Sequence, residues 1–150
     1  MIDFTEDQLE RYSRHIILKD VGLKGQSKLL ESKVLIIGAG GLGSPIALYF
    51  TAPGIGTIGM IDNDVVDLSN LQRQIIHFTG DVDTPKVESA ATKMKALNPD
   101  VTVRTYKEFV NASNVVDIIK EYDFVIDGTD NFASKFLIND ACVMTRIPFS

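Results

Sequence analysis

Short aliphatic runs alternate along this chain with segments that have the spacing of helices. Residues 34–37 and 57–61 are apolar runs bounded by glycine or polar residues, a pattern typical of strands covered on both faces of a parallel sheet. Residues 123–127 predict a further buried strand, and residues 147–150 predict the start of another. Residues 101–106 alternate between polar and apolar side chains, which predicts a strand at or near a sheet edge.

Helices are predicted between the strands. The first should begin near Leu42, directly after a run of glycines. The second is expected to have Thr84 as its cap and Pro85 at its first helical position, because proline has the φ angle of a helix and no N–H to leave unpaired. It should end at about Leu97, since Asn98 precedes a proline and is pushed out of helical geometry. Two later helices are predicted over residues 111–120, with Asn111 as cap, and over residues 131–144.

The chain begins with a segment of helical character, residues 1–32. Thr5 is expected to cap a helix that has Gln8 in its first turn, and a second short helix, roughly residues 25–31, should lead into the first strand. Arg14 lies on a basic side of the first helix, for which a solvated surface is the simplest interpretation.

The order of strands and helical crossovers indicates the fold class. It predicts a doubly wound, Rossmann-like α/β sheet over residues 33–150, mostly parallel and with helices on both faces, preceded by the helical segment. The chain has 150 residues, of which 45% are hydrophobic, so it is long enough to bury the core of one domain.

The spacing Gly38, Gly40, Gly43 has the form G-x-G-x-x-G between the first strand and its crossover helix. This spacing permits a tight turn, close approach of the backbone to a phosphate, and an anion at the positive end of the helix. Asp62 follows the second strand about twenty residues later, where a ribose-binding acid is expected. Glycines after a strand can simply make a turn, but the strand, the helix and the acid together predict a nucleotide site.

Further polar residues should gather at the carboxyl edge of the sheet, where open α/β sheets bind ligands. Arg73 can bind phosphate oxygens with a fork of N–H groups. Lys86 falls in the first turn of a helix, where the helix dipole disfavours a cation, so a nearby anion would stabilise it; the simpler interpretation is a surface lysine. Asp130 follows the last buried strand and is expected either to hold Mg²⁺ bound to phosphates or to cap the next helix.

Composition narrows the class of protein. The net charge of −5 gives no electrostatic reason to expect nucleic acid or an anionic membrane as a partner. Cys142 is the only cysteine, which excludes an internal disulfide and suits a reducing cytoplasm; it is expected to be a small core residue. The N-terminus lacks the pattern of a signal peptide, and no apolar run approaches the ~18 residues that span a bilayer. A cytoplasmic location is therefore expected.

Several short motifs occur in order over nearly the whole chain. They are RYSRHI at 11–16, GAGGLGS at 38–44, D-x-D at Asp62 and Asp64, SNLQRQ at 69–74, PK at 85–86, NP at 98–99 and DGTDN at 127–131. Together they resemble the ThiF/MoeB/HesA family, which is similar to the adenylating core of ubiquitin-activating enzymes. This resemblance is far more specific than the glycine spacing alone.

The resemblance implies an ATP-dependent adenylyltransferase. Its substrate would be the C-terminal Gly-Gly carboxylate of a small ubiquitin-like sulfur-carrier protein of the ThiS or MoaD type. The reaction would form an acyl-adenylate and pyrophosphate, for sulfur transfer in thiamine or molybdopterin biosynthesis. The implied cofactors are ATP and Mg²⁺, and the implied assembly is a homodimer.

The resemblance also assigns roles to individual residues. Asp62 would bind the ribose, and Asp130 would ligate Mg²⁺. Asn70, Arg73 and Lys86 would hold the triphosphate, and Arg14 would reach the phosphates of the opposite subunit. The full set of expected nucleotide-binding residues is Gly38, Gly40, Gly41, Gly43, Asp62, Asp64, Ser69, Asn70, Gln72, Arg73, Lys86, Asp130 and Asn131.

The chain departs from the family pattern at two places. Pro53 stands where a small residue is expected, and Asp83-Thr84 stands where glycine and a basic or polar residue are expected. Family members continue with a C-terminal part that carries paired C-x-x-C zinc sites, so structural Zn²⁺ is expected only there. The alternative hypothesis is a non-catalytic module that binds ATP or NAD.

Overall fold

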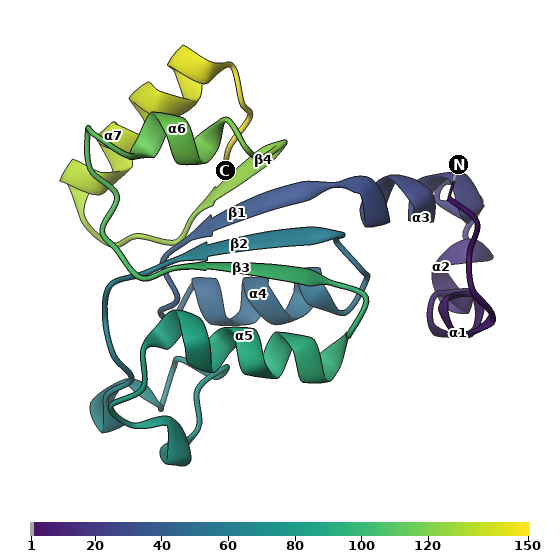
Figure 1. Cartoon of the computed structure of the whole chain (residues 1–150), viewed down its shortest axis with the longest axis horizontal. Coiled ribbons are helices and arrows are strands. Elements are labelled where there is room, and N and C mark those ends of the chain that lie inside the picture. Colours follow the sequence, from purple (N-terminus) through teal and green to yellow (C-terminus); the bar gives the residue numbers. More distant parts are fainter. Residues whose placement is uncertain (1) are drawn as a thin grey trace.

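The computed structural model describes residues 2–150 and contains, within them, one four-stranded parallel sheet. Its strands are β1 (Lys33–Ile37), β2 (Thr57–Ile61), β3 (Thr102–Tyr106) and β4 (Phe124–Asp127), in the order β3-β2-β1-β4 (Figure 1). β3 lies at an edge, as predicted. Phe149 forms a parallel bridge with Val125, so the predicted strand at 147–150 does begin beside β4.

Helices cover both faces of the sheet, which confirms the predicted fold class. α4 and α5 pack on one face, and α6 and α7 pack on the other (Figure 1). The helices are α1 (Glu6–Arg11), α2 (Ser13–Ile16), α3 (Gly22–Glu31), α4 (Gly43–Thr51), α5 (Lys86–Leu97), α6 (Val115–Ile119) and α7 (Phe132–Thr145), with short 3₁₀ helices η1 (Leu68–Asn70) and η2 (Thr79–Asp81). No helix in the described residues is both long and apolar enough to cross a membrane.

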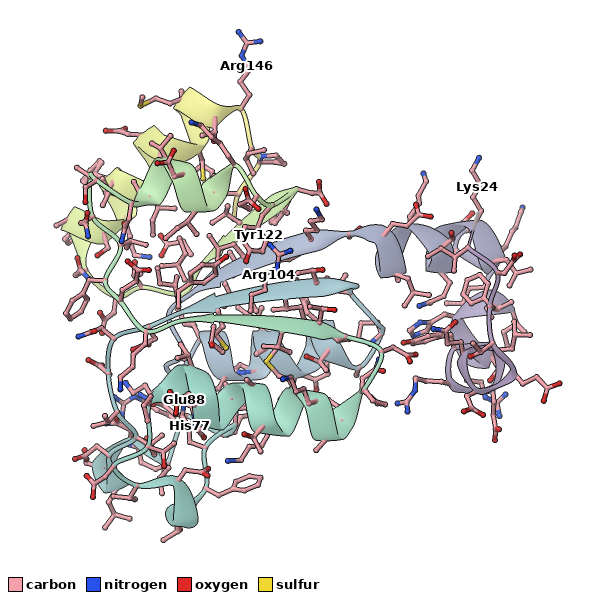
Figure 2. All side chains as sticks on the ribbon, in the orientation of Figure 1. Lys24, His77, Glu88, Arg104, Tyr122 and Arg146 are labelled. Carbon is pink, nitrogen blue, oxygen red and sulfur yellow. The ribbon has the colours of Figure 1, made fainter. Side chains whose placement is uncertain are left out.

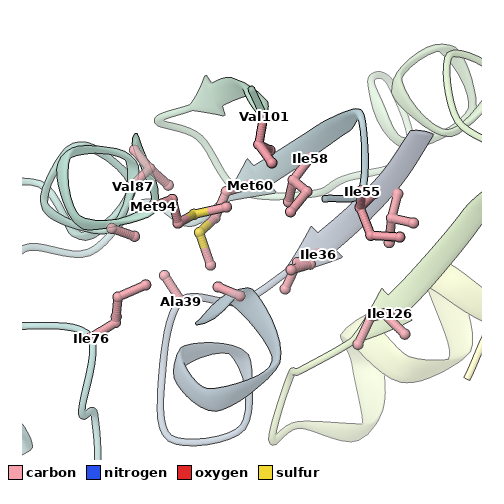
Figure 3. Packing of buried hydrophobic residues seen from close by; sticks show 13 residues of the cluster. Ile36, Ala39, Ile55, Ile58, Met60, Ile76, Val87, Met94, Val101 and Ile126 are labelled. Carbon is pink, nitrogen blue, oxygen red and sulfur yellow. The ribbon is translucent and has the colours of Figure 1, made fainter. Parts of the chain in front are cut away.

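Alternate residues of β1 fill two different cores. Ile36 packs with Met60 and Met94 in the core between the sheet and helices α4 and α5, which Figure 3 shows. Leu35 points the other way, into a core that contains Ile119 and, as predicted, the buried Cys142. Because both faces of the strand are covered, its middle has no polar position.

The predicted N-terminal helix is interrupted, which corrects one expectation. Thr5 does cap α1, and its hydroxyl accepts from the N–H of Gln8 in a reciprocal capping box. At Tyr12, however, the backbone leaves helical geometry (φ −98°, ψ 9°), and α2 begins after it. The reason is the burial of this side chain: Tyr12 is 1% exposed, and its hydroxyl lies 2.9 Å from Asn98 Nδ2 and 3.3 Å from Asp100 Oδ2.

Three other predicted helix starts are wrong. α3 begins at Gly22, earlier than the predicted start at about residue 25. Pro85, not Thr84, occupies the cap position of α5, and Lys86 is its first residue. α6 begins later than predicted, with Asn114 at its cap position, because the side chain of Asn111 accepts from the N–H of Ser113 and forms a turn instead.

The helical segment α1–α3 lies at the amino end of the strands. α3 leads directly into Lys33 at the start of β1, so this segment is separated from the carboxyl edge by the length of the sheet (Figure 1). Tyr12 packs against Gly54, whose φ of +84° favours glycine and where a Cβ would lie 2.4 Å from the tyrosine hydroxyl. These contacts fasten the segment to the domain.

Gly43 allows α4 to begin directly against β1. A Cβ at this position would lie 1.8 Å from the carbonyl oxygen of Gly38, which is backbone and cannot rotate away. We expect Gly43→Ala to lower the free energy of unfolding by at least about 2 kcal/mol, because the main chain must move to admit the methyl group. Urea denaturation monitored by circular dichroism measures this change.

Gly80→Ala is the matched control, because a Cβ at Gly80 would meet nothing within 4 Å. It should change the free energy of unfolding by no more than about 0.5 kcal/mol. Equal stability of the two variants would contradict the close packing at Gly43.

Candidate functional site

A cleft of about 630 Å³ lies at the carboxyl edge of the sheet. It is formed by the glycine turn after β1 and by the loops that follow β2, β3 and β4. This is the crevice in which open α/β sheets bind ligands. Ten of the residues expected from the sequence line it: Gly38, Gly40, Gly41, Asp62, Asp64, Asn70, Arg73, Lys86, Asp130 and Asn131.

Four expected residues do not line the cleft. Gly43 is buried in the first turn of α4, and Gln72 is exposed with its amide donating to the carbonyl of Ser69. Ser69 donates to Asp67 through both its hydroxyl and its N–H, and these hydrogen bonds lower the pKa of that carboxyl. Arg14 is exposed on α2, at the other end of the sheet (Figure 1).

The glycine turn lies against the backbone of the residue that follows β4. Gly38 has φ +100°, and a Cβ there would lie 2.9 Å from the carbonyl oxygen of Gly128. The carboxylate of Asp62 accepts the N–H of Ala39 at one oxygen and the N–H of Asp64 at the other, both at 2.8 Å. A carboxylate can accept about four hydrogen bonds, so both oxygens of Asp62 keep capacity for hydroxyl donors in the cleft.

Arg73 lies directly over the turn. A Cβ on Gly41 would be 3.4 Å from Cγ of Arg73, so the lack of a side chain at Gly41 makes room for the arginine stem. The loop carrying Arg73 is held by its own backbone, because the N–H groups of Arg73 and Gln74 both donate to the carbonyl of Asn70. The guanidinium is exposed and shares the cleft with the backbone of the turn.

Lys86 is buried at the base of the cleft, with 6% of its side chain exposed. Its ammonium lies 2.9 Å from Oδ2 of Asp64, and its N–H donates to the carbonyl of the same residue. Val65 and Pro85 form an antiparallel bridge next to this pair. The segment after β2 therefore holds the start of α5, and this pairing directs Lys86 into the cleft rather than to the surface.

The departure from the family pattern at Asp83 has a backbone explanation. Asp83 has φ +69°, in the left-handed region that favours glycine and that aspartate tolerates better than most residues. Its N–H donates to the carbonyl of Val66, so the turn before α5 keeps its pairing with the chain after β2.

Asp130 does not cap the helix that follows it. The cap of α7 is Asn131, whose side-chain oxygen accepts the N–H of Ser134 at 2.9 Å. Asp130 is exposed on the wall of the cleft, and its carboxylate forms no hydrogen bond or ion pair with residues 2–150. The neighbouring Asp127 is engaged differently, since it accepts from Thr129 and lies 3.4 Å from the ammonium of Lys135.

Sequence reasoning missed several residues of this region. Phe109 lines the cleft from the loop after β3, a stretch with no motif. His77 is 4% exposed beneath the glycine turn, and burial lowers its pKa. Gln74 is also 4% exposed and lines the cleft, although it belongs to a motif that was identified. A buried polar residue in a loop has no periodicity that could reveal it.

The sheet, the glycine turn and the position of the cleft are those of a Rossmann-like α/β domain. The chain belongs to the ThiF family, whose model matches residues 12–150. This confirms the resemblance inferred from the motifs.

Curated relatives match almost the whole chain. It is 50% identical over 145 residues to the probable adenylyltransferase/sulfurtransferase MoeZ of Mycobacterium tuberculosis, covering 97% of this chain and 37% of MoeZ. It is 50% identical over 141 residues to the SAMP-activating enzyme E1 of Haloferax volcanii, covering 94% of this chain and 52% of that enzyme. It is 44% identical over 140 residues to a probable molybdopterin-synthase adenylyltransferase of Porphyra purpurea, covering 93% of this chain and 37% of that protein. The chain thus spans at most about half of these relatives.

Solved structures of similar fold contain nucleotides. The Escherichia coli tRNA N6-threonylcarbamoyladenosine dehydratase TcdA in complex with ATP has a TM-score of 0.92 at 28% identity, covering 99% of this chain and 60% of that one. The Escherichia coli protein MccB, in a complex with AMPCPP and MccA, has a TM-score of 0.79 at 30% identity, covering 93% and 43%.

The Asp64–Lys86 pair should contribute to the stability of the free protein. We expect Asp64→Asn to lower the free energy of unfolding by about 1–3 kcal/mol, because it removes the counter-charge of a buried ammonium group. Thermal unfolding without nucleotide measures this effect.

Asp117→Asn is the control, since Asp117 pairs with Lys120 on the surface, where their side chains are 84% and 58% exposed. That change should have almost no effect. If both variants have the same thermal stability as the wild type, the buried Asp64–Lys86 pair does not stabilise the free protein.

Proposed function

We propose that this chain is the nucleotide-binding part of an ATP-dependent adenylyltransferase. Its substrate would be the C-terminal Gly-Gly carboxylate of a small ubiquitin-like sulfur carrier. The carboxylate oxygen attacks the α-phosphorus of ATP, the bond to the β-phosphate breaks, and pyrophosphate leaves with the electron pair. The product is an acyl-adenylate of the carrier.

The observation that carries this proposal is the grouping of charge in one cleft. Arg73 and Lys86 bring two cations to the side of the glycine turn, and Asp130 brings a carboxylate that has no partner within residues 2–150. Nucleotidyl transfer depends on positioned cations more than on a protein nucleophile, and these residues supply them. The diphosphate of a dinucleotide such as NAD carries less charge than a triphosphate, so it would engage these two cations and this acid much less.

Lys86 has a defined role in this scheme. In the free protein its ammonium is paired with Asp64 at 2.9 Å. A bound triphosphate offers more negative charge than one carboxylate, so the ammonium would turn from Asp64 to the phosphates. Asp64 is 61% exposed and can remain charged in water when the lysine leaves it.

Asp130 is the residue that would hold Mg²⁺. No group of three or more His, Cys, Asp or Glu side chains in residues 2–150 is arranged to hold a metal ion by itself. One carboxylate fits Mg²⁺ bound mainly by phosphates and water, which is the usual arrangement in nucleotide enzymes. The ion would neutralise phosphate charge, while Asn70 and Arg73 hold the phosphates from the side of the turn.

Arg14 would act on the phosphates of a second copy of the chain. It is exposed on α2, at the amino end of the strands, and therefore far from the cleft of its own chain (Figure 1). Its chain neighbours are anchored, since Tyr12 is buried and His15 lies 3.0 Å from Gln26. At the opposite end of the sheet from its own cleft, Arg14 could reach phosphates only in the cleft of another copy, so this role implies a homodimer with a shared site.

Relatives' names favour one sulfur pathway. One curated relative is called a probable molybdopterin-synthase adenylyltransferase. We therefore favour a carrier of molybdopterin biosynthesis over one of thiamine biosynthesis. A reaction in the cytoplasm is part of the proposal, since the single cysteine of the sequence suits a reducing compartment.

Arg73→Ala tests the nucleotide site directly. We expect isothermal titration calorimetry with ATP and Mg²⁺ to show binding at least tenfold weaker than in the wild type, because a charge-assisted contact to phosphate is worth about 1.5–3 kcal/mol. Arg104→Ala is the control, since Arg104 pairs with Glu121 and does not line the cleft. Figure 2 shows Arg104 on the sheet, near Tyr122.

The same titration with NAD distinguishes the proposed ATP site from the alternative, a non-catalytic module that binds NAD. The proposal expects ATP to bind more tightly than NAD, and the difference to shrink in the Arg73 variant. Stronger binding of NAD, or an unchanged ATP affinity after Arg73→Ala, would count against the site.

A pyrophosphate exchange assay tests the reaction. The chain, joined to the remaining part of a homologous adenylyltransferase, is incubated with ATP, Mg²⁺, labelled pyrophosphate and a Gly-Gly-ended carrier. We expect label to enter ATP only when the carrier is present, because exchange requires reversible adenylate formation. A carrier lacking its last glycine is the control. Exchange at the same rate with and without the carrier would contradict the proposed substrate.

A further inference from the structure

A buried histidine connects the glycine turn to the helix that carries Lys86. His77 is 4% exposed and lies between the turn and α5, as Figure 2 shows for its position beside this helix. Its Nε2 is 2.9 Å from the carbonyl oxygen of Ala39, in the turn. Its Nδ1 is 2.9 Å from the hydroxyl of Ser89, one helical turn after Lys86 in α5.

These contacts determine the tautomer of the ring. A carbonyl oxygen can only accept, so Nε2 must carry the proton that is donated to Ala39. In the neutral ring Nδ1 is then an acceptor, and the hydroxyl of Ser89 donates to it. The oxygen of Ser89 remains free to accept from the ammonium of Lys93, 3.2 Å away.

The carbonyl of Ala39 has a particular place in the turn. The N–H of the same residue donates to Asp62, which would bind the ribose. The residue is thus held from two sides, by Asp62 at its N–H and by His77 at its carbonyl. Rotation of this peptide would move the following residues, Gly40 and Gly41, whose backbone lines the cleft.

We propose that His77 is a positioning residue of the nucleotide site, which locks the glycine turn to α5 and so fixes the distance between the backbone of the turn and Lys86. The proposal rests on the proposed function, because it assigns His77 to that site without contact to the nucleotide. It goes further in naming a link between the two structural parts that would meet the phosphates.

The charges around His77 favour the neutral ring. Lys86 and Lys93 face it from α5, and Asp81, which pairs with Lys93, faces it from η2. Burial lowers the pKa of His77 most, and the two ammonium groups act in the same direction, whereas the hydrogen bond to Ala39 and the charge of Asp81 oppose them; the net effect is a lowered pKa. A protonated ring would donate from both nitrogens and leave the proton of Ser89 without its acceptor.

Glutamine and asparagine at position 77 distinguish the hydrogen bond to Ala39 from the one to Ser89. The amide nitrogen of glutamine can occupy the place of Nε2, whereas that of asparagine can occupy only the place of Nδ1. We expect His77→Gln to keep ATP binding within about twofold of the wild type, because it can still donate to Ala39. His77→Asn should bind ATP about tenfold more weakly, the effect expected for the loss of one buried hydrogen bond.

Nuclear magnetic resonance gives a test that does not need ATP. The ¹⁵N shifts of His77 should report a proton on Nε2 at pH 8, and amide exchange over residues 38–44 should be faster in His77→Asn than in His77→Gln. Failure of ATP to bind the wild type would overturn the proposed function, while these signals would still support or contradict the link. A proton on Nδ1, or equal amide exchange and ATP affinity in both variants, would overturn the positioning role.

The pH dependence of stability gives an independent check. Since the folded pKa of His77 is lowered, the unfolded chain takes up the proton first as pH falls below about 6.5. Wild-type stability should therefore fall from this pH down to the lowered pKa, and part of that fall should be missing in His77→Gln. Identical pH profiles would contradict the neutral, hydrogen-bonded ring.

Discussion

An ammonium group buried at the end of a parallel sheet must have a partner. Lys86 meets this constraint with Asp64, whose carboxylate lies 2.9 Å away and whose carbonyl accepts the lysine N–H. The pairing of Val65 with Pro85 brings these segments together. The start of α5, the course of the loop after β2 and the charge at the base of the cleft all depend on this arrangement. The proposed function requires that the ammonium can exchange this carboxylate for phosphate.

Close main-chain contacts place the backbone of the turn beside that charge. Gly38 and Gly43 approach so closely that a methyl group on the latter would collide with the carbonyl of the former. The turn also lies against Gly128, so the neighbouring ends of β1 and β4 form one continuous part of the cleft wall. Backbone groups are rigid compared with long side chains, and a site built on them needs little reorganisation when an anion binds.

The parts predicted from the sequence are those that depend on local pattern. β2 was predicted with its observed ends, because an apolar run between glycine and acid leaves little freedom. The helix starts were predicted less well: burial of Tyr12 splits the first helix, and the local turn at Asn111 delays α6. The first outcome depends on a tertiary contact and the second on a local hydrogen bond from backbone to side chain, and hydrophobic periodicity reveals neither.

The candidate site likewise contains residues that local motifs predict and residues that only the folded structure reveals. Residues in ordered motifs, such as Arg73 and Asp130, line one cleft, although roles for them rest on the proposed function. Asn131 takes the cap of α7, so the simpler role for Asp130 does not apply. His77 could not be found, because its importance comes from a carbonyl 38 positions away. No spacing rule relates a loop histidine to a distant peptide.

A crystal structure of the chain with Mg²⁺ and a non-hydrolysable ATP analogue would show whether Lys86 exchanges its carboxylate partner for phosphate. We expect the ribose at Asp62, the phosphates between the glycine turn, Arg73 and Lys86, and the ammonium of Lys86 turned away from Asp64. The proposed site would be wrong if the nucleotide bound outside the cleft, or bound inside it while Lys86 stayed paired with Asp64 and touched no phosphate.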